Sequence, residues 1–315
     1  MPLDHDFLER LFRGDRVAIA RGITFVENEH AHAIDLLKQI YPHTGKAYRV
    51  GITGPPGAGK STITNKLARL YSAGGKRVGV IAVDPTSPFT GGALLGDRVR
   101  MTDVEMDARV FIRSMASRGS LGGLSRKTRE AADVLDASGC DIIFLETVGV
   151  GQSELDIAGA ADTTVVVLVP ESGDSIQAMK AGLMEIADFF VVNKADRAGA
   201  EQAVMSIKMV LAFKPGVNGW SADVVQTIAN DGKGIDLVAK TIDAHARFLE
   251  AHDLLLAKRE QRVVERIREL VGKQLHVEFW NEAREKALKA TIHDVVTLKQ
   301  TPYDVAENLL KDFKN

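Results

Sequence analysis

The chain has 315 residues, of which 45% are hydrophobic and 26% are charged, and its formal net charge at pH 7 is -2. This composition is typical of a globular protein with a sizeable core, and the length fits two domains or one α/β domain with appendages. Acidic and basic residues are mixed along the chain, which excludes the strongly basic stretches of proteins that wrap nucleic acid or coat membranes. We therefore expect neither nucleic acid nor a membrane as a partner.

Residues 1–46 carry no strand signal and are predicted to form an N-terminal helical extension. Apolar residues recur there at helical spacing, and Gly14 and the stretch 42–45 interrupt the pattern. The apolar positions are Leu8, Leu11, Phe12, Ile34, Leu37 and Ile40.

Residues 47–247 alternate short β-rich runs with longer helical segments. The runs are "YRVGITG", "RVGVIAVD", "RVFIRS", "DIIFLET", "TTVVVLVP", "FFVVNK" and "VVQTIA". Because most are almost continuously apolar, we expect strands covered on both faces, as in a parallel sheet. Segments 60–73, 120–138, 173–187 and 200–212 are long enough for crossover helices. The prediction is an α/β fold with a doubly wound, mostly parallel sheet.

Residues 248–315 are predicted to be a helical arm outside this domain. Val263, Ile267, Leu270 and Leu275 form one apolar stripe among many charges. The stripe needs something to pack against, either the chain's own domain or a second subunit, and both alternatives stay open.

The chain has a single cysteine, Cys140, so an intrachain disulfide is impossible and a reducing compartment is expected. Cys140 is interpreted as a small buried hydrophobic residue at the start of a strand. The segment "MPLDHDFLER" lacks the apolar region of a signal peptide, and no window of about 18 apolar residues predicts a membrane span. These features predict a soluble cytoplasmic protein.

A phosphate-binding motif, G-x-x-x-x-G-K-[ST], lies between the first predicted strand and a helix. Its glycines let backbone N–H groups turn toward a phosphate without a Cβ clash. Lys60 is expected to reach the β- and γ-phosphates, Ser61 to bind Mg²⁺, and Thr62 to hold the α-phosphate. The predicted phosphate-binding residues are Gly54, Pro55, Pro56, Gly57, Ala58, Gly59, Lys60, Ser61 and Thr62.

The tetrapeptide "NKAD" at residues 193–196 follows an apolar strand and predicts recognition of guanine. The Asp196 carboxylate can accept hydrogen bonds from guanine N1–H and the 2-amino group, whereas adenine would leave it unpaired. Asn193 is expected to frame the base, and the Lys194 side chain to lie over its face. The backbone contacts to the base oxygen are expected from Ile228, Ala229 and Asn230. GTP is therefore the predicted substrate, and GDP the product.

Acidic residues at or after strand ends predict a magnesium site. Glu146 ends a hydrophobic strand, and Gly149 follows it, where a backbone N–H can sense the γ-phosphate. Gln152 is a candidate for positioning the attacking water. Asp84 ends the second predicted strand, and Asp97 lies in a glycine-rich segment.

Simpler interpretations of several of these residues stay open. Asp84 could cap a helix, and Asp97 could be a solvated loop acid. Arg98, Arg100 and Arg113 could contact phosphate, although surface arginines are usually solvated.

Five stretches together resemble one family: "GITGPPGAGKST", "VIAVDPTSPFTGGALLGDRVRM", "SRGSLGGLSRKTREA", "ETVGVGQSE" and "VNKAD". They are similar to the MeaB/ArgK-type GTPases, P-loop proteins of the SIMIBI class, over about residues 10–270. These GTPases are chaperones of methylmalonyl-CoA mutase and related adenosylcobalamin enzymes. The resemblance implies a homodimer with contacts from the C-terminal arm, and slow GTP hydrolysis that the mutase accelerates.

The resemblance also implies that GTP gates cobalamin delivery to the mutase, or removal of damaged cofactor from it. By position it implies catalytic or metal-site roles for Lys60, Ser61, Asp84, Asp97 and Glu146. It places Lys180 in a switch segment that faces the partner, although a solvated helix lysine is the simpler interpretation.

Three other functions are alternatives for a chain with this phosphate-binding motif. A nickel-inserting GTPase usually has a histidine-rich tract or a C-x-x-C pair, whereas the 8 histidines here are scattered apart from His30 and His32. An ATP-dependent kinase tied to amino-acid transport is disfavoured by "NKAD". A non-hydrolysing scaffold would bind GTP without turnover.

Overall fold

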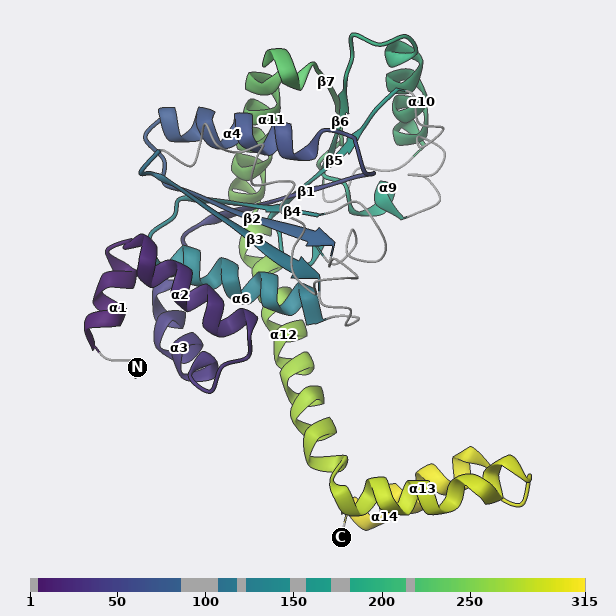
Figure 1. Ribbon diagram of the computed structural model, residues 1–315. Helices are drawn as coiled ribbons and strands as arrows, with labels where there is room; N and C mark the ends of the chain where they lie inside the picture. Colours follow the sequence, from purple (N-terminus) through teal and green to yellow (C-terminus); the bar gives the residue numbers. More distant parts are fainter. Residues whose placement is uncertain are drawn as a thin grey trace. The chain divides into compact units, whose positions relative to one another are not determined.

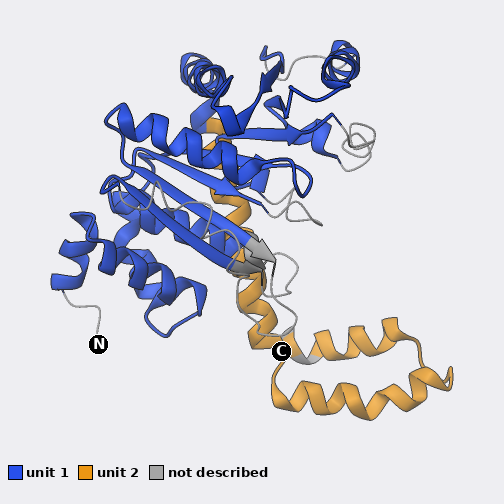
Figure 2. Ribbon diagram, turned by 45° about the horizontal axis from the view of Figure 1, so that its top comes forward, with its two compact units in different colours: residues 1–256 blue, residues 257–315 orange. Residues whose placement is uncertain are grey.

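The computed structural model describes residues 5–85, 107–117, 123–147, 157–170, 182–213 and 219–314 (Figure 1). The chain forms two compact units, residues 1–256 and 257–315 (Figure 2). The three-part division predicted at residues 46 and 247 stays a prediction. Among the described residues, no helix is both long enough and apolar enough to cross a bilayer.

The first unit is built on a 7-stranded sheet in the order β3-β2-β4-β1-β5-β6-β7, in which every pairing is parallel. The predicted doubly wound α/β fold is confirmed, and each predicted β-rich run contains one strand. The strands are β1 Tyr48–Thr53, β2 Val78–Pro85, β3 Val110–Ser117, β4 Ile142–Glu146, β5 Thr163–Leu168, β6 Phe189–Asn193 and β7 Val224–Thr227.

Helices cover both faces of the sheet, which explains the continuous apolar runs. Successive strand residues point to opposite faces, so Val165 joins the core under α4 (Lys60–Ala73) and α11 (Ile235–Ala251). The next residue, Val166, joins the opposite core with α9 (Leu183–Ile186) and α10 (Ala200–Ala212). All residues of β4, β5 and β6 are buried as a result.

The N-terminal helices α1 (His5–Phe12), α2 (Arg16–Glu27) and α3 (Ala33–Ile40) share a core with α6 (Gly123–Ala137) (Figure 1). A short 3-10 helix, Tyr41–His43, follows α3. Five of the predicted apolar positions contribute to this core: Leu8, Leu11, Phe12, Leu37 and Ile40.

The sixth position, Ile34, lies in α3 as the helical spacing predicts, but the residue is 67% exposed. The buried face of α3 is instead Ala33, Leu36 and Ile40, at a spacing of three and four residues. Ile34 lies one residue outside this face.

A buried carboxylate joins the N-terminal helices to the sheet. Asp136 of α6 accepts hydrogen bonds from the backbone N–H groups of Gly45, Lys46 and Ala47, at 2.8, 3.1 and 3.0 Å. It also pairs with the Arg49 guanidinium of β1, at 3.2 Å. The linker before β1 is therefore held by side-chain hydrogen bonds rather than by a strand pairing.

The second unit is helical, as predicted for the C-terminal segment. Helix α12 (Leu254–Phe279) leads into it, and α13 (Glu282–Val296) and α14 (Pro302–Lys314) follow. All four residues of the predicted apolar stripe on α12 are at least 40% exposed. Both alternatives for the partner of this stripe, the chain's own domain and a second subunit, stay predictions.

Candidate nucleotide-binding site

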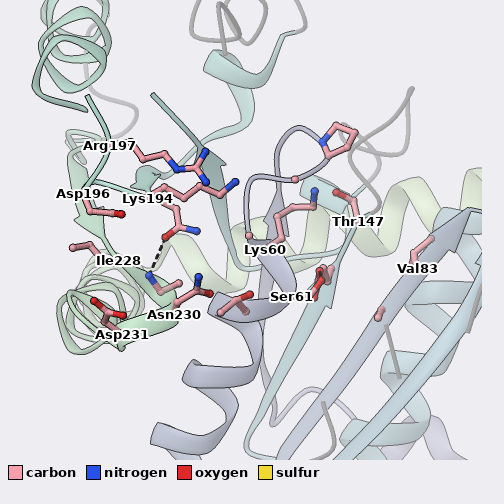
Figure 3. Close-up of a pocket in the computed structure, with 18 residues that line it drawn as sticks. Lys60, Ser61, Val83, Thr147, Lys194, Asp196, Arg197, Ile228, Asn230 and Asp231 are labelled. Carbon is pink, nitrogen blue, oxygen red and sulfur yellow. Dashed lines mark hydrogen bonds between the residues drawn. The ribbon is translucent and has the colours of Figure 1, made fainter. Parts of the chain in front are cut away.

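A pocket of about 410 Å³ lies at the carboxyl ends of the central strands (Figure 3). Lys60 and Ser61 line it on one side, and Lys194, Asp196 and Ile228 line it on the other (Figure 3). Ligands of doubly wound α/β proteins bind at this edge of the sheet, where the loops after the strands converge. The predicted phosphate and base motifs, far apart in sequence, therefore line the same pocket.

The phosphate loop joins β1 to α4 and depends on glycine at two close approaches. Gly54 has φ +133°, and a Cβ there would lie 2.0 Å from the carbonyl oxygen of Val167. Gly59 has φ +89°, and a Cβ there would lie 2.2 Å from Nδ2 of Asn193. Only glycine fits both the backbone conformation and the space. Helix α4 begins directly afterwards, so the unpaired N–H groups of its first turn lie at the pocket.

The Lys60 ammonium is buried beside the first residues of the phosphate loop. Its Nζ donates hydrogen bonds to the carbonyl oxygens of Gly54 and Pro55, at 2.8 and 3.0 Å. These carbonyls offset the cost of burying a charge. The side chain is 6% exposed and lines the pocket, which places a cation beside the loop.

Two oxygen ligands of the kind that Mg²⁺ prefers meet on the phosphate side. Ser61 Oγ donates to Glu146 Oε1 at 2.5 Å, and both residues line the pocket. Glu146 ends β4, the neighbour of β1, which explains how the acid reaches the start of α4. Hydroxyl and carboxylate oxygens are the donor types that suit a magnesium ion, and here they meet at the start of α4.

The other predicted metal ligands cannot be placed in the same way. The backbone of Asp84 belongs to β2, next to β4, but its side chain lies outside the described residues, as does all of Asp97. In the described part of the chain, no cluster of three or more His, Cys, Asp or Glu forms a metal site.

Asn193 joins the two sides of the pocket through hydrogen bonds. Its Nδ2 donates to the carbonyl oxygen of Ala58, at 2.9 Å. Its Oδ1 accepts from Thr227 Oγ1 and from Ala229 N–H, both at 3.0 Å. All polar atoms of this 3% exposed amide thus have protein partners, and it frames the pocket from behind.

The loop after β6 presents the predicted base-reading residues. Lys194 has φ +58°, an unusual value for a residue with a side chain. The N–H of Ala195 donates to the carbonyl of Thr227, at 3.0 Å, which anchors the loop to β7. Asp196 is exposed at the pocket edge, where a base could reach its carboxylate (Figure 3).

The segment after β7 forms the rest of the base side. Ile228, Ala229 and Asn230 line the pocket, as expected for backbone contacts to a base. Ile228 bridges to Lys233 through its N–H, at 3.0 Å, so this turn has a defined shape.

The pocket also has lining residues that the sequence analysis missed. They are Ala82, Val83, Thr147, Arg197 and Asp231. Thr147, Arg197 and Asp231 directly follow predicted site residues, and this adjacency was the available signal.

Other predicted site residues do not line the pocket. Gly54, Pro55 and Ala58 belong to the phosphate loop, where their carbonyl oxygens accept hydrogen bonds from Lys60 and Asn193. Arg113, for which a solvated arginine was the simpler interpretation, does not line the pocket either and pairs with Glu27 of α2, at 2.5 Å. Gly149, Gln152 and Lys180 lie outside the described residues.

Comparison with known proteins identifies the family. Residues 19–284 match the model of the family described as methylmalonyl Co-A mutase-associated GTPase MeaB. The chain belongs to the MeaB family. The family resemblance expected from the sequence motifs is therefore confirmed.

Individual relatives of this MeaB-family chain cover nearly its whole length. A Pyrococcus abyssi protein is 49% identical over 98% of the chain and 96% of its own length. GTPase ArgK of Escherichia coli is 37% identical, over 90% of this chain and 89% of its own. The mouse protein named methylmalonic aciduria type A homolog, mitochondrial, is 33% identical, over 98% and 80% respectively.

The crystal structure of a protein named LAO/AO transport system kinase has the same fold as this MeaB-family chain. The two superpose with a TM-score of 0.78 at 28% sequence identity, over 100% of both chains.

Proposed function

We propose that this MeaB-family chain binds GTP in the described pocket and hydrolyses it to GDP and phosphate with Mg²⁺. One observation carries the proposal: the phosphate loop with Lys60 and Ser61, and the loop with Asn193 and Asp196, line the same pocket. The family is named for GTPases, as is the Escherichia coli relative, which supports the same activity here.

Each side of the pocket has its own part in the proposed reaction. Lys60 and the backbone N–H groups at the start of α4 bind the β- and γ-phosphates and balance their charge. Ser61 and Glu146 hold Mg²⁺, which, when bound, stabilises negative charge on the transferring phosphoryl group. Asp196 accepts from guanine N1–H and the 2-amino group, and Lys194 covers the base.

The proposal also assigns roles to residues that lie, wholly or by their side chains, outside the described part of the chain. Asp84 and Asp97 complete the surroundings of the metal and the γ-phosphate. The Gly149 N–H senses the γ-phosphate, Gln152 positions the attacking water, and Lys180 belongs to a partner-facing switch. Loss of the γ-phosphate would release such segments, the usual way in which a GTPase reports hydrolysis.

We further propose that hydrolysis serves an adenosylcobalamin-dependent acyl-CoA mutase as protein partner. The family is described as associated with methylmalonyl Co-A mutase, and the mouse relative is named for methylmalonic aciduria. In this proposal the protein is a cytoplasmic homodimer, slow alone and accelerated by the mutase, which gates cofactor loading or rescue.

The base preference tests the nucleotide proposal. We expect Asp196→Asn to lower GTP affinity by about a hundredfold or more and to raise affinity for xanthosine triphosphate, because the amide donates where the carboxylate accepted. Asp236→Asn, an exposed acid on α11 paired with Lys240, is the control and keeps the wild-type preference. Wild-type protein that hydrolyses ATP faster than GTP would support the transport-kinase alternative instead.

The metal and the partner need separate measurements. Glu146→Ala is expected to weaken the Mg²⁺ dependence of GTP hydrolysis.

Purified methylmalonyl-CoA mutase is expected to increase GTP turnover by the wild-type protein. Unchanged turnover at saturating mutase would refute the mutase partnership, and binding without any turnover would favour a scaffold.

A further inference from the structure

Two buried hydroxyl groups meet at the carboxyl ends of β1 and β4. Thr147 Oγ1 donates a hydrogen bond to Thr53 Oγ1, at 3.0 Å. Thr53 is the last residue of β1, immediately before Gly54, and Thr147 directly follows Glu146 at the end of β4. They are 0% and 2% exposed, so water does not compete for this bond.

The hydroxyl pair lies at the carboxyl ends of these two neighbouring strands. The backbone register pairs Ile52 with Glu146, and the N–H of Thr147 donates to the carbonyl of Ile52, at 3.1 Å. After Thr53 the chain turns into the phosphate loop. Thr147 itself lines the pocket.

Stability alone does not require hydroxyl groups at these two positions. Valine has nearly the same shape as threonine, needs no hydrogen-bond partner and is favoured in buried strands. Replacing both partners of a buried hydrogen bond by apolar groups of the same shape can be nearly neutral for stability. The pair therefore calls for a role in the arrangement of the site.

We propose that the Thr53–Thr147 hydrogen bond is a positioning device that fixes Glu146 against Ser61 for binding the magnesium–nucleotide complex. The inference rests on the proposed GTPase function. Thr53 leads within eight residues to Ser61, and Thr147 is the next residue after Glu146, so the bond controls the separation of the two oxygens now 2.5 Å apart. Displacements of about 1 Å in such constellations cost catalytic rate by large factors.

Hydroxyl-free variants test the proposal. Thr147→Val and Thr53→Val are each expected to raise the Mg²⁺ concentration that half-saturates fluorescent GDP binding by roughly fivefold, and to lower kcat for GTP by roughly tenfold. At saturating Mg²⁺, KM for GTP should stay within about twofold, because the phosphate loop and base contacts are intact. Thr147→Ser keeps the hydroxyl and should restore both values.

A double variant and a matched control separate positioning from stability. Thr53→Val/Thr147→Val should be no worse than either single variant, because both remove the same bond. Thr128 of α6 is also a 2% exposed threonine, and its Oγ1 has no hydrogen-bond partner among the described residues. Thr128→Val should leave Mg²⁺ dependence and kcat unchanged and should not lower the melting temperature, because it removes a buried hydroxyl that has no partner among the described residues.

The outcomes distinguish this inference from the proposed function. The inference alone would be overturned if the wild-type protein hydrolyses GTP and Thr147→Val has the same Mg²⁺ dependence and kcat as the wild type. Additive losses in the double variant, or failure of Thr147→Ser to restore the values, would overturn it as well. Wild-type protein without Mg²⁺-dependent nucleotide binding would overturn the proposed function and this inference with it.

Discussion

Asn193 donates a hydrogen bond from its side-chain amide to the backbone carbonyl of Ala58, 2.9 Å away, and so joins the loop after β6 to the phosphate loop. The two residues are 135 positions apart in sequence. The same amide accepts the N–H of Ala229 on the base side. A single side chain thus sets the distance between the phosphate half and the base half of the pocket.

Removal of the Asn193 side-chain amide should weaken the binding of GTP and of GDP to a similar extent. Asn193→Ala breaks three hydrogen bonds, each worth about 1 kcal/mol, so GTP and GDP affinity should both fall by roughly a hundredfold. Titration with fluorescent nucleotides measures the effect. Gln202→Ala, an exposed amide on α10, is the control, and an equal loss there would contradict the bridging role.

Lys60→Ala should abolish GTP hydrolysis while the fold is retained. The ammonium is the buried cation beside the loop, and its loss leaves the carbonyls of Gly54 and Pro55 beside a pocket that water can fill. Affinity for GTP should fall, whereas affinity for guanosine, which has no phosphate, should not. Turnover and circular dichroism measure these outcomes, and wild-type turnover would show that the loop is misassigned.

Asp136→Ala should loosen the N-terminal helices from the sheet. The fully buried carboxylate accepts from three backbone N–H groups and pairs with Arg49, so its loss should cost about 3 kcal/mol of unfolding free energy. Chemical denaturation measures the cost, and limited proteolysis should show faster cleavage near residues 44–47. Asp35→Ala, an exposed acid on α3, should have little effect, and equal losses would disprove the anchoring role.

Cys140 should resist alkylation in the folded protein. Burial raises the pKa of the Cys140 thiol from 9.0 to about 11, so the thiol form is favoured at pH 8. Iodoacetamide labelling at pH 8, followed by mass spectrometry, should be at least about a hundredfold slower than in the urea-unfolded chain. Similar rates in both states would contradict the burial.

The same raised pKa predicts how stability depends on pH at this residue. The folded-state pKa lies above the unfolded value, so the contribution is fully present below pH 9 and is lost as the pH rises toward 11. The unfolding free energy of the wild type should therefore fall across this range more than that of Cys140→Ala.

Local patterns determined the secondary structure and the motifs of this chain. Continuous apolar runs predicted the strands because both faces of the sheet are covered, and the phosphate loop and "NKAD" were recognisable because each is a short contiguous segment. Ile34 belongs to the predicted helical pattern but lies beside the buried face of its helix, because spacing alone does not fix the helix rotation.

Contacts between distant segments were decided only by the tertiary structure. The sequence left Arg113 either a phosphate contact or a solvated surface arginine, whereas β3 brings it to Glu27 of α2, 86 positions away. The Thr53–Thr147 pair spans 94 positions and has no sequence signature. Spacing along the chain encodes which residues share a face of one element, whereas the order of strands in the sheet decides which elements meet. The strands and the two binding motifs could therefore be predicted from the sequence, whereas the hydrogen bonds that join the motifs into one pocket could not.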